Sequence, residues 1–385
     1  MKQVTGFKNS WILTEDGLKK TNLIIENSKI LSIGDATIDG MIELDDDKMV
    51  IPGLIDQHIH GAAGVDVIDG SVDDLYKMAC SLVEEGVTAF LATTTNQSIE
   101  VIDKSLETIN EYINRNYEEG AEIVGIHLEG PFICQKYMGA QLGNYILKPD
   151  VELFKHFEVK SNNLIKIVSM AIEEDKNLEL VNYLKSKNIV ISIGHSAANY
   201  IDIKEGIEHG VSCVTHTYNG MKPLQRDEIG TLGSALLFDE LYCEAICDGV
   251  HISKPAVKLL VKNKPIDKLI LVTDSLRTKY MPDGKYYELE QVIILKGKEA
   301  RLEDGKLAGS VLKMNEAIKN IMEFSDMDIV SAIKCATENP ARNLGLFDTM
   351  GSIKENKLAN LVIVDKNLNV YQTIRNGKVV YKKVN

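Results

Sequence analysis

The sequence predicts an α/β protein: a TIM-like (β/α)8 barrel with a small β-sandwich domain formed by the N- and C-terminal segments. Two observations support this fold class. Eight short apolar runs alternate with helical patterns through the middle of the chain, whereas both ends read as strands joined by tight turns. We therefore expect residues 1–51 and 346–385 to form the β domain and residues 52–345 to form the barrel.

The two ends of the chain share one pattern. Residues 11–35 alternate apolar and polar side chains, with a turn signal at Asp16-Gly17. The last stretch repeats this pattern, with Asn376-Gly377 as its turn signal. Because a few strands alone bury too little apolar surface, we expect the two ends to pair with each other.

The middle of the chain supplies the predicted barrel strands. The eight runs are residues 53–60, 88–95, 122–129, 164–171, 189–196, 211–217, 242–249 and 268–275. Amphipathic helical patterns lie between them, for example at residues 71–86 and 175–188. Chemistry in such barrels is carried at the C-terminal ends of the strands, so the residues that end each run are the candidates for a functional site.

Composition limits the partners of the chain. Its net charge of −13 argues against nucleic acid and against an anionic membrane surface, although a local basic pocket for a small anion remains compatible with it. The six cysteines form no close CxxC pair, which is typical of reduced thiols. Neither a signal-peptide stretch nor a run of 18 apolar residues is present, so we expect a cytoplasmic protein.

Polar residues end most of the runs. They are His58, His60, Glu129, His195, His216 and Asp274; Asp248 lies near the end of the seventh run and His251 just after it. Each one alone has an ordinary explanation, since a buried histidine is often just hydrogen-bonded and an aspartate often caps a helix. Together, four histidines and two carboxylates at one rim predict a divalent metal site. A nitrogen and oxygen ligand set without thiolate suits zinc or iron(II).

Several motifs carry a resemblance to a known family. They are PGLIDQHIHG, HLEGPF, GHSAA, THTYNGM, DGVH, LVTDS, LAGS and ENPARNLGL. In this order and spacing the sequence resembles the N-acetylglucosamine-6-phosphate deacetylase family of the amidohydrolase superfamily. The resemblance runs through most of the chain and implies a metal-dependent barrel with a small β domain. It also implies a homodimer with the active site near the interface.

The same resemblance implies roles for individual residues. Glu129, His195 and His216 match the main metal ligands, and the pair His58 and His60 matches the ligands of a second metal in some members. Asp274 matches the catalytic acid and base and completes the ligand set. The residues that match substrate contacts are Ala140, Gln141, Asn219, Gly220, Asp248, Gly249, His251, Leu307, Ala308 and Gly309. One or two divalent metals per subunit are therefore expected.

Two positions depart from the family pattern. Gln141 stands where the family often has a histidine that polarises the substrate carbonyl, and a second metal is expected to take over that work. The stretch QRDEIG places Asp227 where the family has a phosphate-binding arginine, and an aspartate would repel the anion. We expect Arg226, one residue earlier, to replace it. Other candidate cations are Lys222, Arg277 and Lys279.

The resemblance implies hydrolysis of the acetamide of N-acetylglucosamine-6-phosphate to glucosamine-6-phosphate and acetate. N-acetylgalactosamine-6-phosphate is the close alternative substrate. A second possibility is an amidohydrolase that acts on a non-phosphorylated amide and needs no phosphate site. A third is a sugar-phosphate binder without activity, which the complete ligand set and Asp274 argue against.

Overall fold

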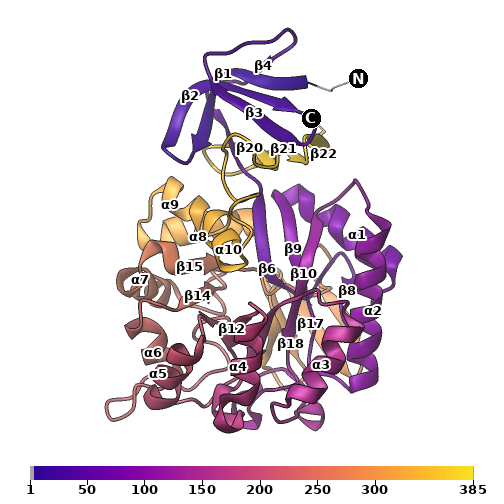
Figure 1. The fold of residues 1–385 in the computed structure, drawn as a ribbon, viewed down its shortest axis with the longest axis vertical. Coiled ribbons are helices and arrows are strands. Elements are labelled where there is room, and N and C mark those ends of the chain that lie inside the picture. Colours follow the sequence, from indigo (N-terminus) through magenta and orange to yellow (C-terminus); the bar gives the residue numbers. More distant parts are fainter. Residues whose placement is uncertain (1–3, 385) are drawn as a thin grey trace.

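The computed structural model describes residues 4–384 and confirms the predicted α/β barrel (Figure 1). Eight parallel strands pair in the order β15-β14-β13-β12-β11-β10-β9-β6, and each overlaps one of the eight predicted runs. Their bounds are β6 (Leu54–Ile59), β9 (Val87–Thr93), β10 (Glu122–Glu129), β11 (Ile165–Met170), β12 (Val190–Ile193), β13 (Cys213–Val214), β14 (Tyr242–Ala245) and β15 (Leu269–Leu271).

The barrel is nearly closed between its first and last strands. The backbone N–H of Asp274, just after β15, donates to the carbonyl of His58 in β6 at 2.8 Å. Nearer the other end of these strands, the N–H groups of Ile55 and Leu271 bond to the carbonyls of Ala336 and Cys335. The gap in strand pairing is thus filled by a later segment of the chain.

Helices surround the barrel (Figure 1). The α-helices are α1 (Val72–Leu82), α2 (Ile99–Arg115), α3 (Val151–Lys160), α4 (Glu179–Ser186), α5 (Tyr200–His209), α6 (Gly230–Leu237), α7 (Lys254–Asn263), α8 (Met314–Ser325), α9 (Ile329–Lys334) and α10 (Glu338–Asn343). Short 3-10 turns are η1 (Val83–Glu85), η2 (Gln135–Tyr137), η3 (Gly143–Tyr145), η4 (Ile172–Glu174), η5 (Lys176–Leu178) and η6 (Ile266–Lys268). The helical patterns at 71–86 and 175–188 contain α1 and α4, as predicted. A capping box between Ser71 and Asp74 starts α1.

The two ends of the chain form one sheet, as the turn signals indicate. Its order is β22-β21-β20-β5-β1-β2-β3, with β4 paired to β1. The strands are β1 (Val4–Thr14), β2 (Gly17–Glu26), β3 (Lys29–Gly34), β4 (Ile42–Glu43), β5 (Lys48–Pro52), β20 (Leu361–Asp365), β21 (Val370–Arg375) and β22 (Lys378–Lys382). Both Asn376 and Gly377 have positive φ, which a tight hairpin turn requires.

Apolar side chains from both halves of this sheet share one core cluster, to which Ile30 in β3 and Ile374 in β21 both belong. The sheet therefore folds over on itself. Its strands lie within the predicted segments 1–51 and 346–385 except for Pro52 at the end of β5. The limits of the two domains remain a prediction, and residues 1–3 and 385 lie outside the described part of the chain.

A third sheet follows β15 and was not predicted. It contains β16 (Gly284–Glu288), β17 (Gln291–Lys296), β18 (Glu299–Leu302) and β19 (Leu307–Gly309), all antiparallel. A small hairpin of β7 (Gly61–Ala62) and β8 (Val65–Asp66) follows β6. The six cysteines are unpaired. Over residues 4–384, no helix is both long enough and apolar enough to cross a bilayer.

Candidate active site

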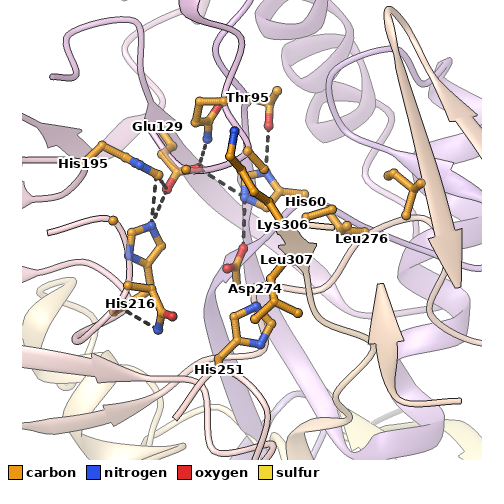
Figure 2. A pocket seen from close by; sticks show the side chains of 18 of the residues that line it. His60, Thr95, Glu129, His195, His216, His251, Asp274, Leu276, Lys306 and Leu307 are labelled. Atoms are coloured by element: carbon orange, nitrogen blue, oxygen red, sulfur yellow. Dashed lines mark hydrogen bonds and ion pairs between the residues drawn. The ribbon is translucent and has the colours of Figure 1, made fainter. Parts of the chain in front are cut away.

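A pocket lies over the C-terminal ends of the barrel strands (Figure 2). Six side chains from the strand ends meet at its base, and we call them the floor cluster: His58, His60, Glu129, His195, His216 and Asp274. The sheet β16–β19 forms one side of the pocket, and we call it the wall sheet. The pocket is thus bounded by a predicted region and by an unpredicted one.

The first half of the floor cluster brings three ligand atoms together. Oε1 of Glu129 lies 3.3 Å from Nε2 of His195 and 3.2 Å from Nε2 of His216. The two imidazole nitrogens lie 3.1 Å apart. All three side chains are buried. In a tetrahedral zinc site with bonds of about 2.0–2.1 Å, neighbouring ligand atoms lie about 3.3 Å apart. This triad therefore fits a divalent cation.

The second half has the same spacing. Nε2 of His58 lies 3.3 Å from Nε2 of His60 and 3.4 Å from Oδ1 of Asp274, and His60 lies 3.2 Å from the same carboxylate oxygen. Glu129 touches this triad as well, because its Oε2 lies 3.3 Å from Nε2 of His60. Figure 2 shows Glu129 between His60 on one side and His195 and His216 on the other. One carboxylate thus adjoins two candidate cation sites.

The backbone turns sharply where these side chains leave their strands. His195, His216 and Asp274 have φ of 49°, 31° and 48°, in the left-handed region that side chains other than glycine rarely adopt. Backbone hydrogen bonds hold two of them, since the carbonyl of His195 accepts from Cys134 at 2.8 Å and that of Asp274 from Ser310 at 2.9 Å. Strained positions of this kind concentrate at functional sites.

Hydrogen bonds to groups outside the floor cluster orient two of its imidazoles. Nδ1 of His195 donates to the backbone carbonyl of Tyr137 at 2.9 Å, which leaves the lone pair of Nε2 facing Glu129. Nδ1 of His58 lies 2.9 Å from the carboxylate of Glu244. Histidines that bind metals commonly hold their second nitrogen in this way.

The carboxylates and imidazoles of the floor cluster stabilise each other's charged forms. Burial alone would raise the pKa of the Glu129 carboxyl, but the surrounding histidines, His58 foremost, hold it well below its usual value. Burial would lower the pKa of His58, yet the charges of Asp274 and Glu129 raise it to about 9. The same histidines overcome burial at Asp274 and lower its pKa to about 2. Both carboxylates are therefore ionised at neutral pH.

Most of the predicted substrate contacts line the pocket. Besides floor residues, the lining includes Ala140, Gln141, Asn219, Gly220, His251, Leu307, Ala308 and Gly309. Asp248 and Gly249 do not line it; instead, Oδ2 of Asp248 accepts from Nδ1 of His251 at 2.7 Å and so orients that ring. Gln141 donates from Nε2 to Oε2 of Glu129 at 2.8 Å, while its Oε1 accepts the N–H of Asn96.

The structure revises the set of candidate phosphate-binding cations. Arg226 and Asp227 are exposed on a loop and do not line the pocket. Lys279, one of the other candidate cations, does not line the pocket: its side chain is fully buried, with the ammonium 2.6 Å from Oε1 of Glu85. Arg277 is held by Asp69 at 2.7 Å and by a second carboxylate.

Sequence reasoning missed Lys306, which lies on the pocket lining beside β19. Its ammonium is half exposed and pairs with Asp304 at 2.8 Å. Lys306 directly precedes the motif LAGS, and that position was the available signal. It is the one Lys or Arg side chain on the pocket lining within residues 4–384.

Comparisons with known proteins agree with this geometry. The Amidohydrolase family model matches residues 49–380. An N-acetylglucosamine-6-phosphate deacetylase from Bacillus subtilis (strain 168) is 42% identical over 339 residues, which are 87% of this chain and 85% of the relative. An N-acetylgalactosamine-6-phosphate deacetylase from Escherichia coli O157:H7 is 31% identical over 369 residues, covering 96% of this chain and 97% of the relative.

A solved structure shows the same fold. The crystal structure of N-acetylglucosamine-6-phosphate deacetylase from Thermotoga maritima matches with a TM-score of 0.90 at 34% sequence identity, covering 99% of this chain and 100% of that chain. The resemblance seen in the motifs is thereby confirmed. This chain belongs to the N-acetylglucosamine-6-phosphate deacetylase family of the amidohydrolases.

Proposed function

We propose that this chain hydrolyses the acetamide of N-acetylglucosamine-6-phosphate to glucosamine-6-phosphate and acetate. The observation that carries the proposal is the floor cluster, which lies at the base of the pocket. It contains two triads of buried ligand atoms, and Glu129 of the first triad also contacts the second. The chain belongs to a family of deacetylases that act on this substrate. Asp274 belongs to one triad and also lines the pocket, so a carboxylate reaches both the candidate cation and the substrate space.

The proposed cation is zinc or iron(II), one or two per subunit. Glu129, His195 and His216 would hold the first, and His58, His60 and Asp274 the second. When bound, a divalent cation lowers the pKa of a water and polarises a carbonyl oxygen, which is the activation that amide hydrolysis needs. The absence of thiolates and the ligand spacing of 3.1–3.4 Å support this donor set.

Asp274 carries the proton transfers. Its carboxylate accepts a proton from the attacking water while the water oxygen bonds to the acetamide carbon. The same carboxyl then delivers the proton to the nitrogen of the sugar as the carbon–nitrogen bond breaks, because an amide anion leaves very poorly. One group can serve as base and then as acid in this way. The left-handed φ of Asp274 keeps its side chain directed at the floor cluster.

Other pocket residues orient the sugar phosphate. His251, held by Asp248, presents its free ring edge to the pocket, and Asn219 and Gly220 lie on the same lining. Gln141 is bound to Glu129, so in this account it fixes that carboxylate. Lys306 supplies the cation for the phosphate, in place of the exposed Arg226.

N-acetylgalactosamine-6-phosphate is the second candidate substrate. The E. coli relative is named as a deacetylase of that sugar phosphate, and its match to this chain covers 97% of its length. The two sugars differ only in the configuration of one hydroxyl, so both offer the same acetamide and phosphate. A homodimeric assembly and a cytoplasmic location are further proposals, taken from the family resemblance and the six unpaired cysteines.

An assay of amine release tests the proposal. Zinc-loaded protein is given the two sugar phosphates and unphosphorylated N-acetylglucosamine, with a chelated sample as control. We expect fast turnover of at least one sugar phosphate, little turnover of the free sugar, and loss of activity on chelation that zinc restores. Equal and slow turnover of all three sugars would contradict the proposed substrate class.

A further inference from the structure

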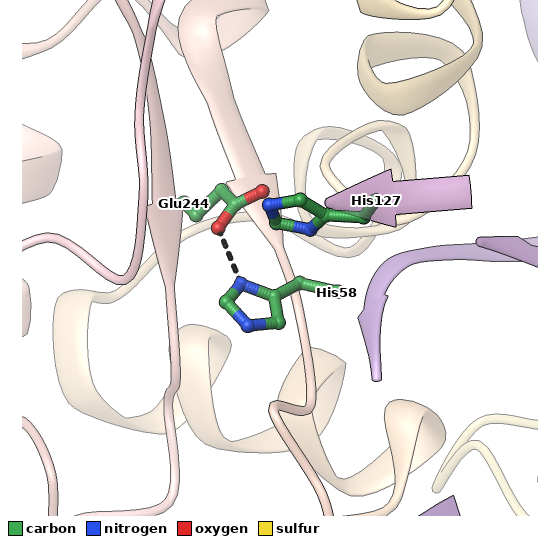
Figure 3. A group of neighbouring side chains, drawn as sticks. All are labelled: His58, His127 and Glu244. Carbon is green, nitrogen blue, oxygen red and sulfur yellow. Dashed lines mark hydrogen bonds and ion pairs between the residues drawn. The ribbon is translucent and has the colours of Figure 1, made fainter. Parts of the chain in front are cut away.

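A buried carboxylate lies behind the floor cluster, on the side away from the pocket. Glu244, in β14, is fully buried and adjoins His58 and His127 (Figure 3). It does not line the pocket, and it does not belong to the proposed ligand set. An ionised carboxylate in such a place is costly unless several donors satisfy it.

Three donors satisfy both oxygens of Glu244. Oε1 accepts from Nε2 of Gln57 at 2.7 Å. Oε2 accepts from Nδ1 of His58 at 2.9 Å and from the backbone N–H of His216 at 3.2 Å. Gln57 is itself held, because its Oε1 accepts from Asn343 at 3.0 Å. These donors hold the carboxylate of Glu244 in one orientation, because they bind both of its oxygens.

The bonds to Oε2 join the two triads of the floor cluster. His58 belongs to the triad with His60 and Asp274, and His216 belongs to the triad with Glu129 and His195. With Nδ1 donating to Glu244, Nε2 is the nitrogen of His58 that faces Asp274, 3.4 Å away. The bond to the N–H of His216 falls at a residue with φ of 31°, where the backbone needs support.

His127 could in principle make this group a third cation site, but its nitrogens are already used. Nδ1 donates to the backbone carbonyl of Gln57 at 3.1 Å, so Nε2 accepts from the hydroxyl of Ser169 at 2.6 Å. The hydroxyl of Ser169 also forms a hydrogen bond with the hydroxyl of Thr215, at 2.5 Å. With one nitrogen donating and the other accepting, both nitrogens of the ring are occupied, and the ring packs against His58.

We propose that Glu244 is a positioning residue that links the two candidate cation sites. It selects the His58 tautomer whose Nε2 can bind a metal, and it holds the backbone from which His216 reaches the other site. This inference rests on the proposed function, since it takes the two triads as metal ligands. Loss of a hydrogen-bond partner of a metal-binding histidine typically weakens metal binding about 10–100-fold.

The variant Glu244→Gln tests the link, because the amide keeps the shape of the side chain but only one acceptor oxygen. Glu158→Gln is the matched control: Glu158 is also a buried glutamate that accepts from a side-chain donor, Tyr183, but it lies on α3 and does not line the pocket. Zinc bound per chain is measured by mass spectrometry across a series of buffered zinc concentrations, and the unfolding temperature is measured without metal.

For Glu244→Gln we expect zinc affinity to fall about 10–100-fold while the metal-free unfolding temperature stays close to that of Glu158→Gln. A zinc isotherm equal to that of the wild type would overturn the proposal. So would loss of one zinc equivalent in His127→Gln, since that result would place a cation between His127 and Glu244. If the wild type itself binds no zinc, the proposed ligand set fails and this inference fails with it, whereas a variant isotherm equal to that of a zinc-binding wild type overturns this inference alone.

A second measurement needs no variant at Glu244. Nitrogen-15 NMR of the histidine rings in the wild-type protein reports which nitrogen of His58 carries the hydrogen, with His58→Asn used to assign the signal. The proposal predicts a hydrogen on Nδ1, both in the metal-free and in the zinc-loaded protein. A hydrogen on Nε2 of His58 in the metal-free protein at neutral pH, with Nδ1 bare, would overturn it.

Discussion

The floor cluster and the wall sheet enclose the same pocket but are built in opposite ways. The floor comes from the ends of parallel strands, its six side chains are almost completely buried, and three of their residues have left-handed backbones. The wall is an antiparallel sheet with exposed turns at Gly297 and Gly305, and its pocket-facing Lys306 is half exposed. The floor is therefore rigid and costly to alter, whereas the wall tolerates change.

This difference separates reaction from recognition. Buried carboxylates and imidazoles can be kept together only if each finds a partner or a cation, so the floor allows little besides metal-assisted chemistry. The wall contributes the ammonium of Lys306, the amide of Gln291, the carboxylate of Glu288, which pairs with Arg277, and apolar contacts for the distal part of a ligand. We expect changes in the floor to affect turnover and changes in the wall to affect substrate affinity.

The largest effect is expected from Asp274→Asn in the floor. The amide cannot accept the proton of the attacking water, so turnover should fall about 10²–10⁴-fold. Zinc content should persist at the triad of Glu129, His195 and His216. Steady-state kinetics and metal analysis check this, with Asp283, an exposed residue just before β16, changed to asparagine as control. A rate near that of the wild type would exclude Asp274 as the acid and base.

A large effect on stability is expected where the wall sheet joins the barrel. Lys279 lies between β15 and β16, and its buried ammonium pairs with Glu85. Lys279→Met would leave the buried carboxylate unpaired and should reduce the free energy of unfolding by about 3–5 kcal/mol. Denaturant unfolding measures the loss. The double variant Lys279→Met, Glu85→Gln should recover part of the lost free energy of unfolding. If it recovers none, the unpaired carboxylate of Glu85 does not cause the loss.

A smaller effect is expected from Lys306→Met in the wall. Loss of one partly exposed hydrogen bond to a charged group should raise KM for the sugar phosphate about 10-fold and leave kcat nearly unchanged. Turnover of the unphosphorylated sugar should not change. Lys296→Met, which removes an exposed lysine of the same sheet outside the pocket lining, is the control. A drop in kcat without a change in KM would place Lys306 in the reaction instead.

The floor could be predicted from the sequence because barrel geometry brings strand ends together. All six residues of the floor cluster stand out as polar residues at the ends of apolar runs. That rule cannot find residues inside a strand, so His127 and Glu244 were missed. The signal for Glu244 was a carboxylate within the apolar run of residues 242–249, a position that burial makes expensive.

The wall could not be placed from the sequence in the same way. Its strands alternate as antiparallel strands do, but they follow the eighth predicted run, where a barrel requires no further strand. Nothing in the local pattern says that the sheet returns to the pocket. The side chain of Lys279 could not be placed for a related reason: its nearness to the eighth strand end suggested access to the ligand, but the side chain turns inward to Glu85.

The central claim is that the floor cluster holds the cation that drives the reaction. Anomalous diffraction at the zinc absorption edge, from crystals of zinc-loaded protein, tests it most directly. The account predicts a peak about 2.0–2.2 Å from ligand atoms of Glu129, His195 and His216, with any second zinc at His58, His60 and Asp274. A protein that is active with zinc but shows its zinc bound by other residues, or none between these side chains, would contradict the account.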